Sequence, residues 1–271
     1  MMTLEEIRKI VESDYETKNL KISDHDLFEV YRYLLMRNEK RADGYEAVLK
    51  TEPYVEIVYR PTKEKEIELK REHIRKHLKF FDSEIYIQDA RLKDFEVVND
   101  ERLKAFQAAE EFLNNYSKDK YQKGLYLHGS YRTGKSFLIS AIAESLAEKN
   151  ITVLFCYMPD LVRSIKQGLS EGNLEERINE LKQADVLMLD DVGGENMTPW
   201  FRDEIFGPIL QYRLSAKLPV FMTSNYGFLG LIDILEVGKE ETDRLRAVRI
   251  IQRIKDLMIP IKLEEIEYKD F

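Results

Sequence analysis

The chain of 271 residues has one cysteine, and none of its apolar runs approaches the roughly 20 residues of a membrane-spanning helix. A single cysteine excludes an internal disulfide and a cysteine-rich zinc site. Because Cys156 lies in the apolar stretch "VLFCYM", we expect it to be a buried core thiol. The acidic, amphipathic start "MMTLEEIRKI" does not read as a secretory signal. These absences favour a cytoplasmic protein without a membrane partner.

The chain also carries fewer positive than negative charges. The 42 lysines and arginines are outnumbered by 50 aspartates and glutamates, which gives a formal net charge of −8. Proteins that coat DNA nonspecifically rely on a basic surface, so the negative net charge excludes a general DNA-coating protein. A local stripe of basic residues is still compatible with this net charge. An acidic balance suits a protein that docks on other proteins.

Two regions of the chain differ in their patterns. Residues 1–98 carry no glycine-rich loop and combine helical spacing with one strand-like segment, "YVEIVYR", which predicts a small, mainly helical N-terminal domain with a linker. Residues 99–271 alternate helices with apolar strands such as "GLYLHG", "ITVLFCYM", "ADVLMLDDV" and "LPVFMTSN". Such strands are buried on both faces, so this part is predicted to be an α/β domain, a parallel sheet covered by helices.

A phosphate-binding pattern, "GSYRTGKS", lies between a predicted strand and a predicted helix at residues 129–136. Its glycines let the backbone wrap around a phosphate so that successive N–H groups point inward. Lys135 is expected to reach the β- and γ-phosphates, and the Ser136 hydroxyl to bind Mg²⁺. The predicted nucleotide-binding residues of this loop are Gly129, Ser130, Tyr131, Arg132, Thr133, Gly134, Lys135, Ser136 and Phe137.

Polar side chains end two further predicted strands. Asp190 and Asp191 follow "VLML", and we expect Asp190 to direct Mg²⁺ beside the loop, on a neighbouring strand. Asp191 is the candidate for orienting the attacking water. Asn225 follows "PVFMTS" and is the candidate for reaching the γ-phosphate or that water. The sequence thus predicts a nucleotide-hydrolysing site, with Asp191 and Asn225 as catalytic residues.

A predicted helix near the end of the chain carries four arginines, two of which, Arg249 and Arg253, share a face. A guanidinium can stabilise charge on a transferring phosphoryl group in its own subunit or in a neighbour's. The alternative is a solvated basic face.

These motifs, in this order, resemble AAA+ P-loop ATPases and, more closely, bacterial replicative helicase loaders of the DnaC/DnaI type. The likeness covers about residues 95–263 and is carried most specifically by "LDDVGGE" followed by "WFRDEIFGPILQYR". It implies ATP and Mg²⁺ as cofactors, and a loader that places the hexameric replicative helicase on single-stranded DNA during primosome assembly. The N-terminal domain would grip the helicase.

The resemblance also implies self-association, with Arg249 or Arg253 acting on an adjacent subunit's ATP. In this family ATP serves as a switch, and Asp191 stands where many relatives of the wider superfamily carry the longer glutamate, so we expect slow hydrolysis. There is one departure: the zinc cysteines usual in the N-terminal domain of DnaI-type loaders are absent, so no zinc is expected. As is usual for these loaders, we expect no full C-terminal helical lid.

Other functions share this loop. A transposition helper ATPase of the IstB type has the same motor, but the long N-terminal region without a basic stretch favours the loader. A metabolic P-loop kinase would need a lid and an acceptor site, which the arginine helix and the strand ending at Asn225 argue against. A binding module that has lost its nucleotide site is disfavoured, because Lys135, Ser136 and Asp190 are intact.

Overall fold

The computed structural model describes residues 2–39, 41–81, 86–238 and 242–264. The chain forms two compact units, Met1–Glu72 and His73–Phe271. The division falls inside helix α3 (Lys63–His77), earlier than the residue-98 boundary expected from the sequence. It falls there because the strand β3 (Leu78–Phe80), which follows α3 directly, pairs with a strand of the second unit.

The first unit combines two helices with a hairpin. Helices α1 (Leu4–Ser13) and α2 (Leu27–Met36) precede the antiparallel strands β1 (Tyr45–Lys50) and β2 (Glu56–Pro61). Apolar residues at helical spacing on the two helices form its core, namely Ile7, Val11, Leu27 and Val30. The two helices match the predicted helical character of the region, β2 lies on the predicted strand-like segment "YVEIVYR", and β1 was not predicted.

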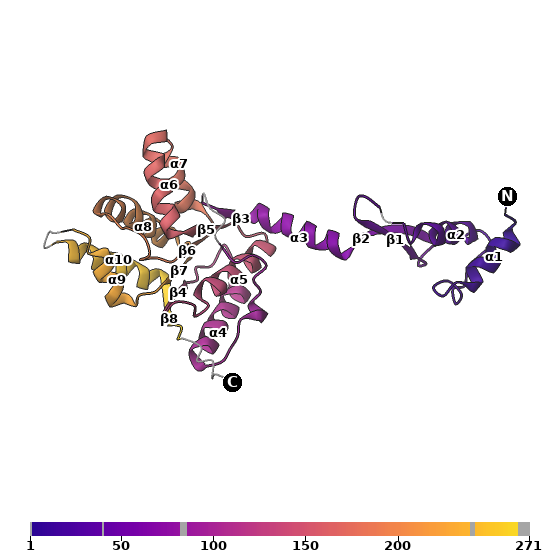
Figure 1. Ribbon diagram of the computed structural model, residues 1–271, viewed down its shortest axis with the longest axis horizontal. Coiled ribbons are helices and arrows are strands. Elements are labelled where there is room, and N and C mark those ends of the chain that lie inside the picture. The colour runs from indigo at the N-terminus through magenta and orange to yellow at the C-terminus, as the bar shows by residue number, and fades with distance from the viewer. Residues whose placement is uncertain (1, 40, 82–85, 239–241, 265–271) are drawn as a thin grey trace. The chain divides into compact units, whose positions relative to one another are not determined.

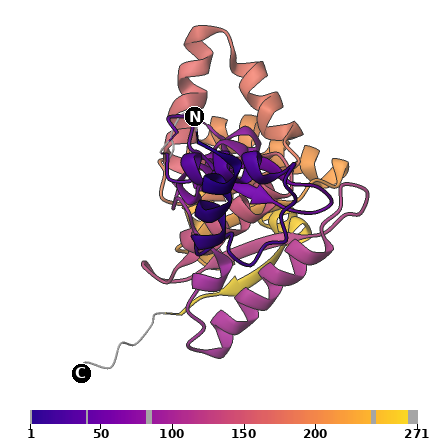
Figure 2. The same cartoon turned by 90° about the vertical axis from the view of Figure 1, so that its right-hand side faces the viewer.

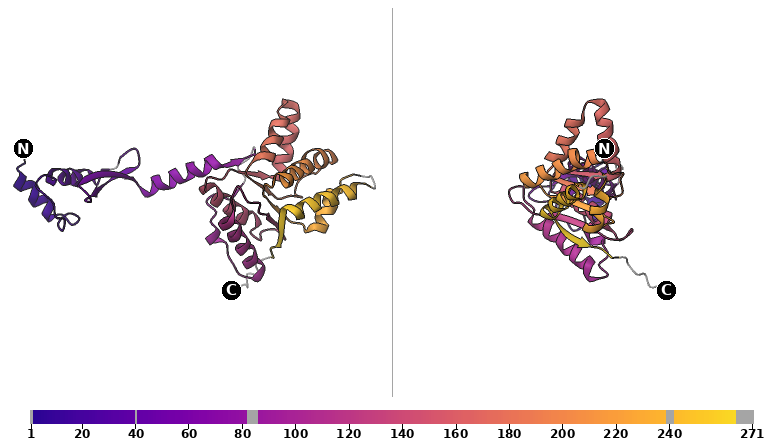
Figure 3. Two further views of the ribbon diagram at one scale, coloured as in Figure 1. Left: turned by 180° about the vertical axis from the view of Figure 1, so that it is seen from behind. Right: turned by 90° about the vertical axis from the view of Figure 1, so that its left-hand side faces the viewer.

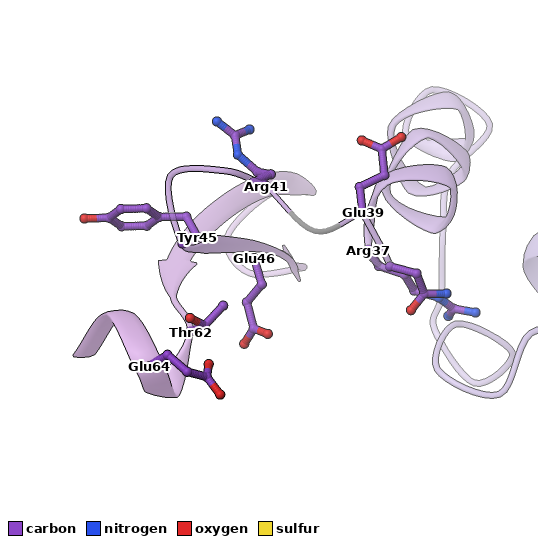
Figure 4. Close-up of a pocket in the computed structure, with 9 residues that line it drawn as sticks. Arg37, Glu39, Arg41, Tyr45, Glu46, Thr62 and Glu64 are labelled. Carbon is purple, nitrogen blue, oxygen red and sulfur yellow. The ribbon is translucent and has the colours of Figure 1, made fainter. Parts of the chain in front are cut away.

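A pocket of about 420 Å³ lies between the end of α2 and the hairpin (Figure 4). Arg37, at its α2 side, is held by Asp14 at 2.6 Å and by Glu16 at 3.1 Å. On the hairpin side, Glu46 accepts a hydrogen bond from Arg60. The charged groups at this pocket thus include side chains engaged in ion pairs within the unit.

The second unit is built on a sheet of six parallel strands in the order β3-β5-β6-β7-β4-β8 (Figure 1). Its remaining strands are β4 (Gly124–His128), β5 (Val153–Tyr157), β6 (Val186–Asp190), β7 (Val220–Ser224) and β8 (Met258–Lys262). The predicted parallel sheet is confirmed. All four strands expected from the sequence are present as β4 to β7.

Helices cover both faces of this sheet, as the two side views show (Figures 2 and 3). One face packs against α4 (Asp100–Asn115) and α5 (Lys135–Glu148). The helices of the other face are α6 (Met158–Glu171), α7 (Leu174–Gln183), α8 (Gly207–Ala216), α9 (Phe228–Leu235) and α10 (Asp243–Leu257). Alternate apolar residues of β4 to β7 enter opposite cores, which explains why these central strands are apolar on consecutive positions.

Several elements differ from the sequence-based expectation. The edge strands β3 and β8 were not predicted, since β3 has three residues and directly continues a charged helix. A 3₁₀ turn, η1 (Leu92–Asp94), precedes α4. The single helix expected in this region begins as a π-helical stretch, η2 (Phe201–Phe206), and continues as α8. Pro208, at the start of α8, cannot donate a backbone hydrogen bond to η2.

Cys156 is fully buried as expected. Within the described residues, no helix combines the length and apolarity needed to cross a bilayer.

Candidate nucleotide site

The loop after β4 has the backbone that its glycines were expected to permit. Gly129 and Gly134 have φ values of 140° and 87°, which residues with a side chain rarely adopt. A Cβ on Gly129 would lie 2.0 Å from the carbonyl oxygen of Leu263, whose N–H donates to His128 just before the loop. The residue that follows β8 thus passes so close to the loop that only glycine fits at position 129.

Lys135 opens α5 and turns back across the loop. Its Nζ donates to the carbonyl oxygens of Gly129 at 2.9 Å and Ser130 at 2.6 Å. The side chain is buried, and this burial lowers the pKa of the ammonium group. A buried ammonium at the centre of the loop, at the N-terminus of a helix, is suited to hold an anion.

Asp190 ends β6 and lies against the loop's serine. Its Oδ1 accepts hydrogen bonds from Ser136 Oγ at 2.9 Å and from Thr223 Oγ1 at 2.5 Å. Burial raises the pKa of the Asp190 carboxyl, against the effect of these two hydroxyl donors. The expectation that Asp190 stands on a strand next to β4 is wrong, because β7 lies between β4 and β6. Thr223, on that middle strand, bridges the gap.

Asp191 and Asn225 meet beyond the ends of β6 and β7. The Asn225 amide donates to Asp191 Oδ1 at 2.9 Å, and the Asp191 N–H donates to Thr223 Oγ1 at 2.8 Å. Asp191 has a φ of 59°, a left-handed conformation uncommon for a side-chain-bearing residue. The carboxylate is therefore fixed in direction by its backbone and by one amide donor.

The remaining predicted loop residues are distributed around this centre. Tyr131 is 71% exposed, and Arg132 is exposed with a φ of 62°. Thr133 is buried, and its hydroxyl donates to the Ser130 carbonyl. Phe137, on the first turn of α5, stacks on Phe95. Among the residues that the structure describes, we find no contact that explains the choice of Tyr131 and Arg132 at these positions.

The two predicted arginines lie on α10 at a separate pocket of about 320 Å³. The residues that line it are Arg202, Asp203, Glu204, Gly207, Arg246, Arg249, Ile250 and Arg253, and the phosphate-binding loop contributes none of them. Arg253 is half-buried and donates to Gln211 at 3.0 Å and to the Gly207 carbonyl. Arg249 is exposed and has no hydrogen-bond or ion-pair partner among the residues that the structure describes.

The structure brings two residues to the site that the sequence did not single out. Thr223 precedes the candidate Asn225 by two positions, and its register opposite the end of β6 was hidden by the unknown strand order. Glu195 lies near Asp191, and its Oε2 accepts the Gly193 N–H at 2.8 Å; its Oε1 is buried and has no hydrogen-bond partner in the described part of the chain. Burial raises the pKa of Glu195 to about 7.

The donor set at Ser136 and Asp190 fits a magnesium ion. A hydroxyl and a carboxylate, converging within hydrogen-bond distance at the loop, are the hard oxygen ligands that Mg²⁺ takes together with phosphate oxygens and water. In the described part of the chain, His, Cys, Asp and Glu form no group of three or more placed to hold a metal through protein ligands alone.

Comparison with known protein families places this site in context. The family described as IstB-like ATP binding protein matches residues 66–232, more than half of the chain. The matched residues include the phosphate-binding loop, both aspartates and Asn225.

Two curated relatives and one solved structure are particularly similar. The replicative helicase loader DnaI of Bacillus subtilis is 39% identical over 185 residues, 66% of this chain and 60% of the relative. The replicative helicase loader DnaC of Buchnera aphidicola is 29% identical over 60% of this chain and 65% of its own length. The crystal structure of DnaI aligns with a TM-score of 0.65 and 40% identity over 70% of this chain and 98% of that chain. The matches thus span about 60 to 65% of the curated relatives' length.

Proposed function

The chain belongs to the family of IstB-like ATP-binding proteins, and on that premise we propose that it is an ATP-dependent loader of the replicative DNA helicase. Its second unit is an AAA+ P-loop domain similar to those of DnaI and DnaC. The proposal assigns ATP binding and hydrolysis to this unit. It assigns the placing of the helicase on single-stranded DNA, and so primosome assembly, to the whole chain.

One observation carries the nucleotide part of the proposal. The strands β6 and β7 are joined to the first turn of α5 by the hydrogen bonds that Asp190 accepts from Thr223 and Ser136. Lys135 is buried in the same loop, and the pair formed by Asp191 and Asn225 lies beyond the same two strands. Such a set provides an anion-binding loop, a metal-binding carboxylate and a polar pair that can orient water, which together support phosphoanhydride hydrolysis.

Each residue has a role that its surroundings support. Ser136 and Asp190 would hold Mg²⁺, which neutralises phosphate charge when it is bound. Lys135 would exchange its bonds to loop carbonyls for bonds to phosphate oxygens. Asp191, kept in place by Asn225, would orient the attacking water. Because its side chain is one methylene shorter than glutamate, we infer slow turnover and the use of ATP as a switch.

Arg249 is the better candidate for a residue that acts on a neighbouring subunit. Arg253 is committed to Gln211 and Gly207, whereas the Arg249 guanidinium is exposed and has no such commitment among the described residues. Its pocket shares no residue with the phosphate-binding loop of the same chain. This separation supports self-association of the AAA+ units, with Arg249 completing the next subunit's site.

The proposed partners follow from the relatives. Both curated relatives reported above are named replicative helicase loaders, which supports the hexameric helicase as the partner. We assign helicase binding to residues 1–98, including the first compact unit, and single-stranded DNA binding to the AAA+ unit. A transposition helper ATPase is the alternative, favoured by the name of the matching family.

A co-purification experiment distinguishes these two functions. The full-length chain is mixed with the host's purified replicative helicase, or with a transposase from an IS21-type element, and complexes are resolved by size-exclusion chromatography with light scattering. The proposal predicts a stable complex with the helicase only. A complex with the transposase and none with the helicase would replace the loader by the transposition helper.

A further inference from the structure

A buried arginine from outside the loop contacts the backbone of the phosphate-binding loop. Arg102 stands on the first turn of α4 and is 3% exposed. Its guanidinium donates to the carbonyl oxygen of Thr133 at 2.5 Å and to that of Glu96, and it stacks over the ring of Phe95 at 4.1 Å. Two of these contacts belong to the segment before α4, and the third belongs to the loop.

The contact with Thr133 fixes the direction of one peptide group. Because the peptide after Thr133 is planar and trans, its carbonyl and the N–H of Gly134 point in opposite directions. Arg102 comes from outside the loop and holds the Thr133 carbonyl, so we infer that the Gly134 N–H points to the opposite side, where a phosphate would bind. This orientation requires the left-handed backbone of Gly134, with its φ of 87°.

The position of Arg102 is itself closely determined. The Asn99 side chain caps α4 and accepts the Arg102 N–H at 2.9 Å. Arg102 and Phe95 also fill the space behind Gly134, where an added Cβ would meet both side chains at 3.4 Å. Burying a guanidinium is costly unless its donors are used, and here they are used on main-chain carbonyls that shape the loop.

We propose that Arg102 is a positioning residue of the nucleotide site: it holds the Thr133–Gly134 peptide in the orientation that binds phosphate. The inference rests on the proposed nucleotide function. It also gives the segment of residues 95–102, which leads into α4, a direct contact with the loop. The Gly134 N–H would face the β-phosphate region, so the effect should be the same for ATP and ADP, unlike that of a residue that senses the γ-phosphate.

The test measures ATP and ADP dissociation constants for the full-length wild type, Arg102→Met and Arg102→Lys. The control is Arg91→Met, which removes an arginine just before that segment; Arg91 pairs with Glu144 and Glu148 on α5 rather than with the loop. We expect Arg102→Met to weaken ATP and ADP binding by the same factor, about tenfold or more. Arg102→Lys should recover part of the affinity, and Arg91→Met should remain within about twofold of the wild type.

Thermal melting of each variant separates positioning from folding. A folded Arg102→Met with wild-type affinity, or with a loss confined to ATP, would overturn the inference. If Arg102→Met does not fold, Arg102→Lys decides, since full wild-type affinity in that variant would also overturn it. If the wild type binds neither nucleotide while Arg91→Met and the wild type are both folded, the proposed function fails first, and this inference fails with it.

Discussion

The Asn225 amide donates a hydrogen bond to Asp191 Oδ1 at 2.9 Å, tying the residue beyond β7 to the residue beyond β6. This bond orients a carboxylate whose proposed task is to hold the attacking water. Its removal should therefore affect the chemical step more than nucleotide binding.

We predict that Asn225→Ala lowers kcat for ATP hydrolysis by about 100-fold, the order expected when a positioned polar group is lost from a hydrolytic site. The ATP dissociation constant should change by no more than a few-fold, since Lys135 and the loop are untouched. Phosphate release and nucleotide titration on the same preparation check both numbers. An unchanged kcat with weakened ATP binding would assign Asn225 to binding instead.

The two arginines of α10 should behave differently. Arg249→Ala is expected to lower hydrolysis by on the order of 1000-fold in the assembled protein and to leave a dilute monomer unaffected. Arg253→Ala should have the smaller effect on turnover, because its side chain is bound within its own subunit. A concentration series of hydrolysis rates checks both expectations.

Mixing two inactive variants tests whether Arg249 acts in trans. Lys135→Ala retains Arg249, and Arg249→Ala retains an intact phosphate-binding loop. In a mixed assembly, a Lys135→Ala subunit can supply Arg249 to the loop of an adjacent Arg249→Ala subunit, so ATP hydrolysis should return at those interfaces. Absence of any recovery, or equal loss of activity in the dilute Arg249→Ala monomer, would remove the trans-acting role.

Thr223 is predicted to matter for stability as well as for the site. Thr223→Val keeps the shape of the side chain but removes the hydroxyl that serves buried Asp190 and the Asp191 N–H. The free energy of unfolding should fall by about 1 to 3 kcal/mol, the usual cost of leaving buried polar groups unpaired. Urea denaturation measures it, with Thr223→Ser as the control that retains the hydroxyl. Equal losses in both variants would point to packing rather than hydrogen bonding.

Glu195 should give the fold a distinct pH dependence. Burial raises the pKa of its carboxyl from 4.5 to about 7. Between these two pH values the folded chain keeps the carboxyl proton, whereas the unfolded chain releases it. The stability that depends on the proton is complete below pH 4.5 and is lost as pH rises to about 7, by up to about 3 kcal/mol. Glu195→Gln, which imitates the protonated form, should lack this loss. Parallel unfolding profiles of the two proteins between pH 4.5 and 8 would contradict it.

The sequence was sufficient to predict the central strands and the phosphate-binding loop. The strands β4 to β7 carry consecutive apolar residues because both faces are buried, and a loop with fixed glycine spacing has few other uses. Edge strands are less apparent. β8 alternates only weakly, with Ile259 48% exposed, and β3 is too short to show a period.

Strand order and the support beneath the loop could not be predicted. Nothing local to Thr223 indicates that β7 separates β4 from β6, because the order is set by how helices pack across the whole sheet. Arg102 looks like a solvated residue in a charged helix start, "NDERLK", and its burial depends on where α4 docks. Such long-range relationships require the fold.

We propose that ATP bound at this loop governs helicase loading. Loading is measured as the amount of replicative helicase retained on circular single-stranded DNA, which offers no end for threading, with and without ATP. The comparison uses the wild type, Lys135→Ala and the exposed-lysine control Lys166→Ala. We expect loading with the wild type and the control, and neither ATP binding nor ATP-dependent loading with Lys135→Ala. Normal ATP affinity in Lys135→Ala, or loading equal to that of the wild type, would contradict it.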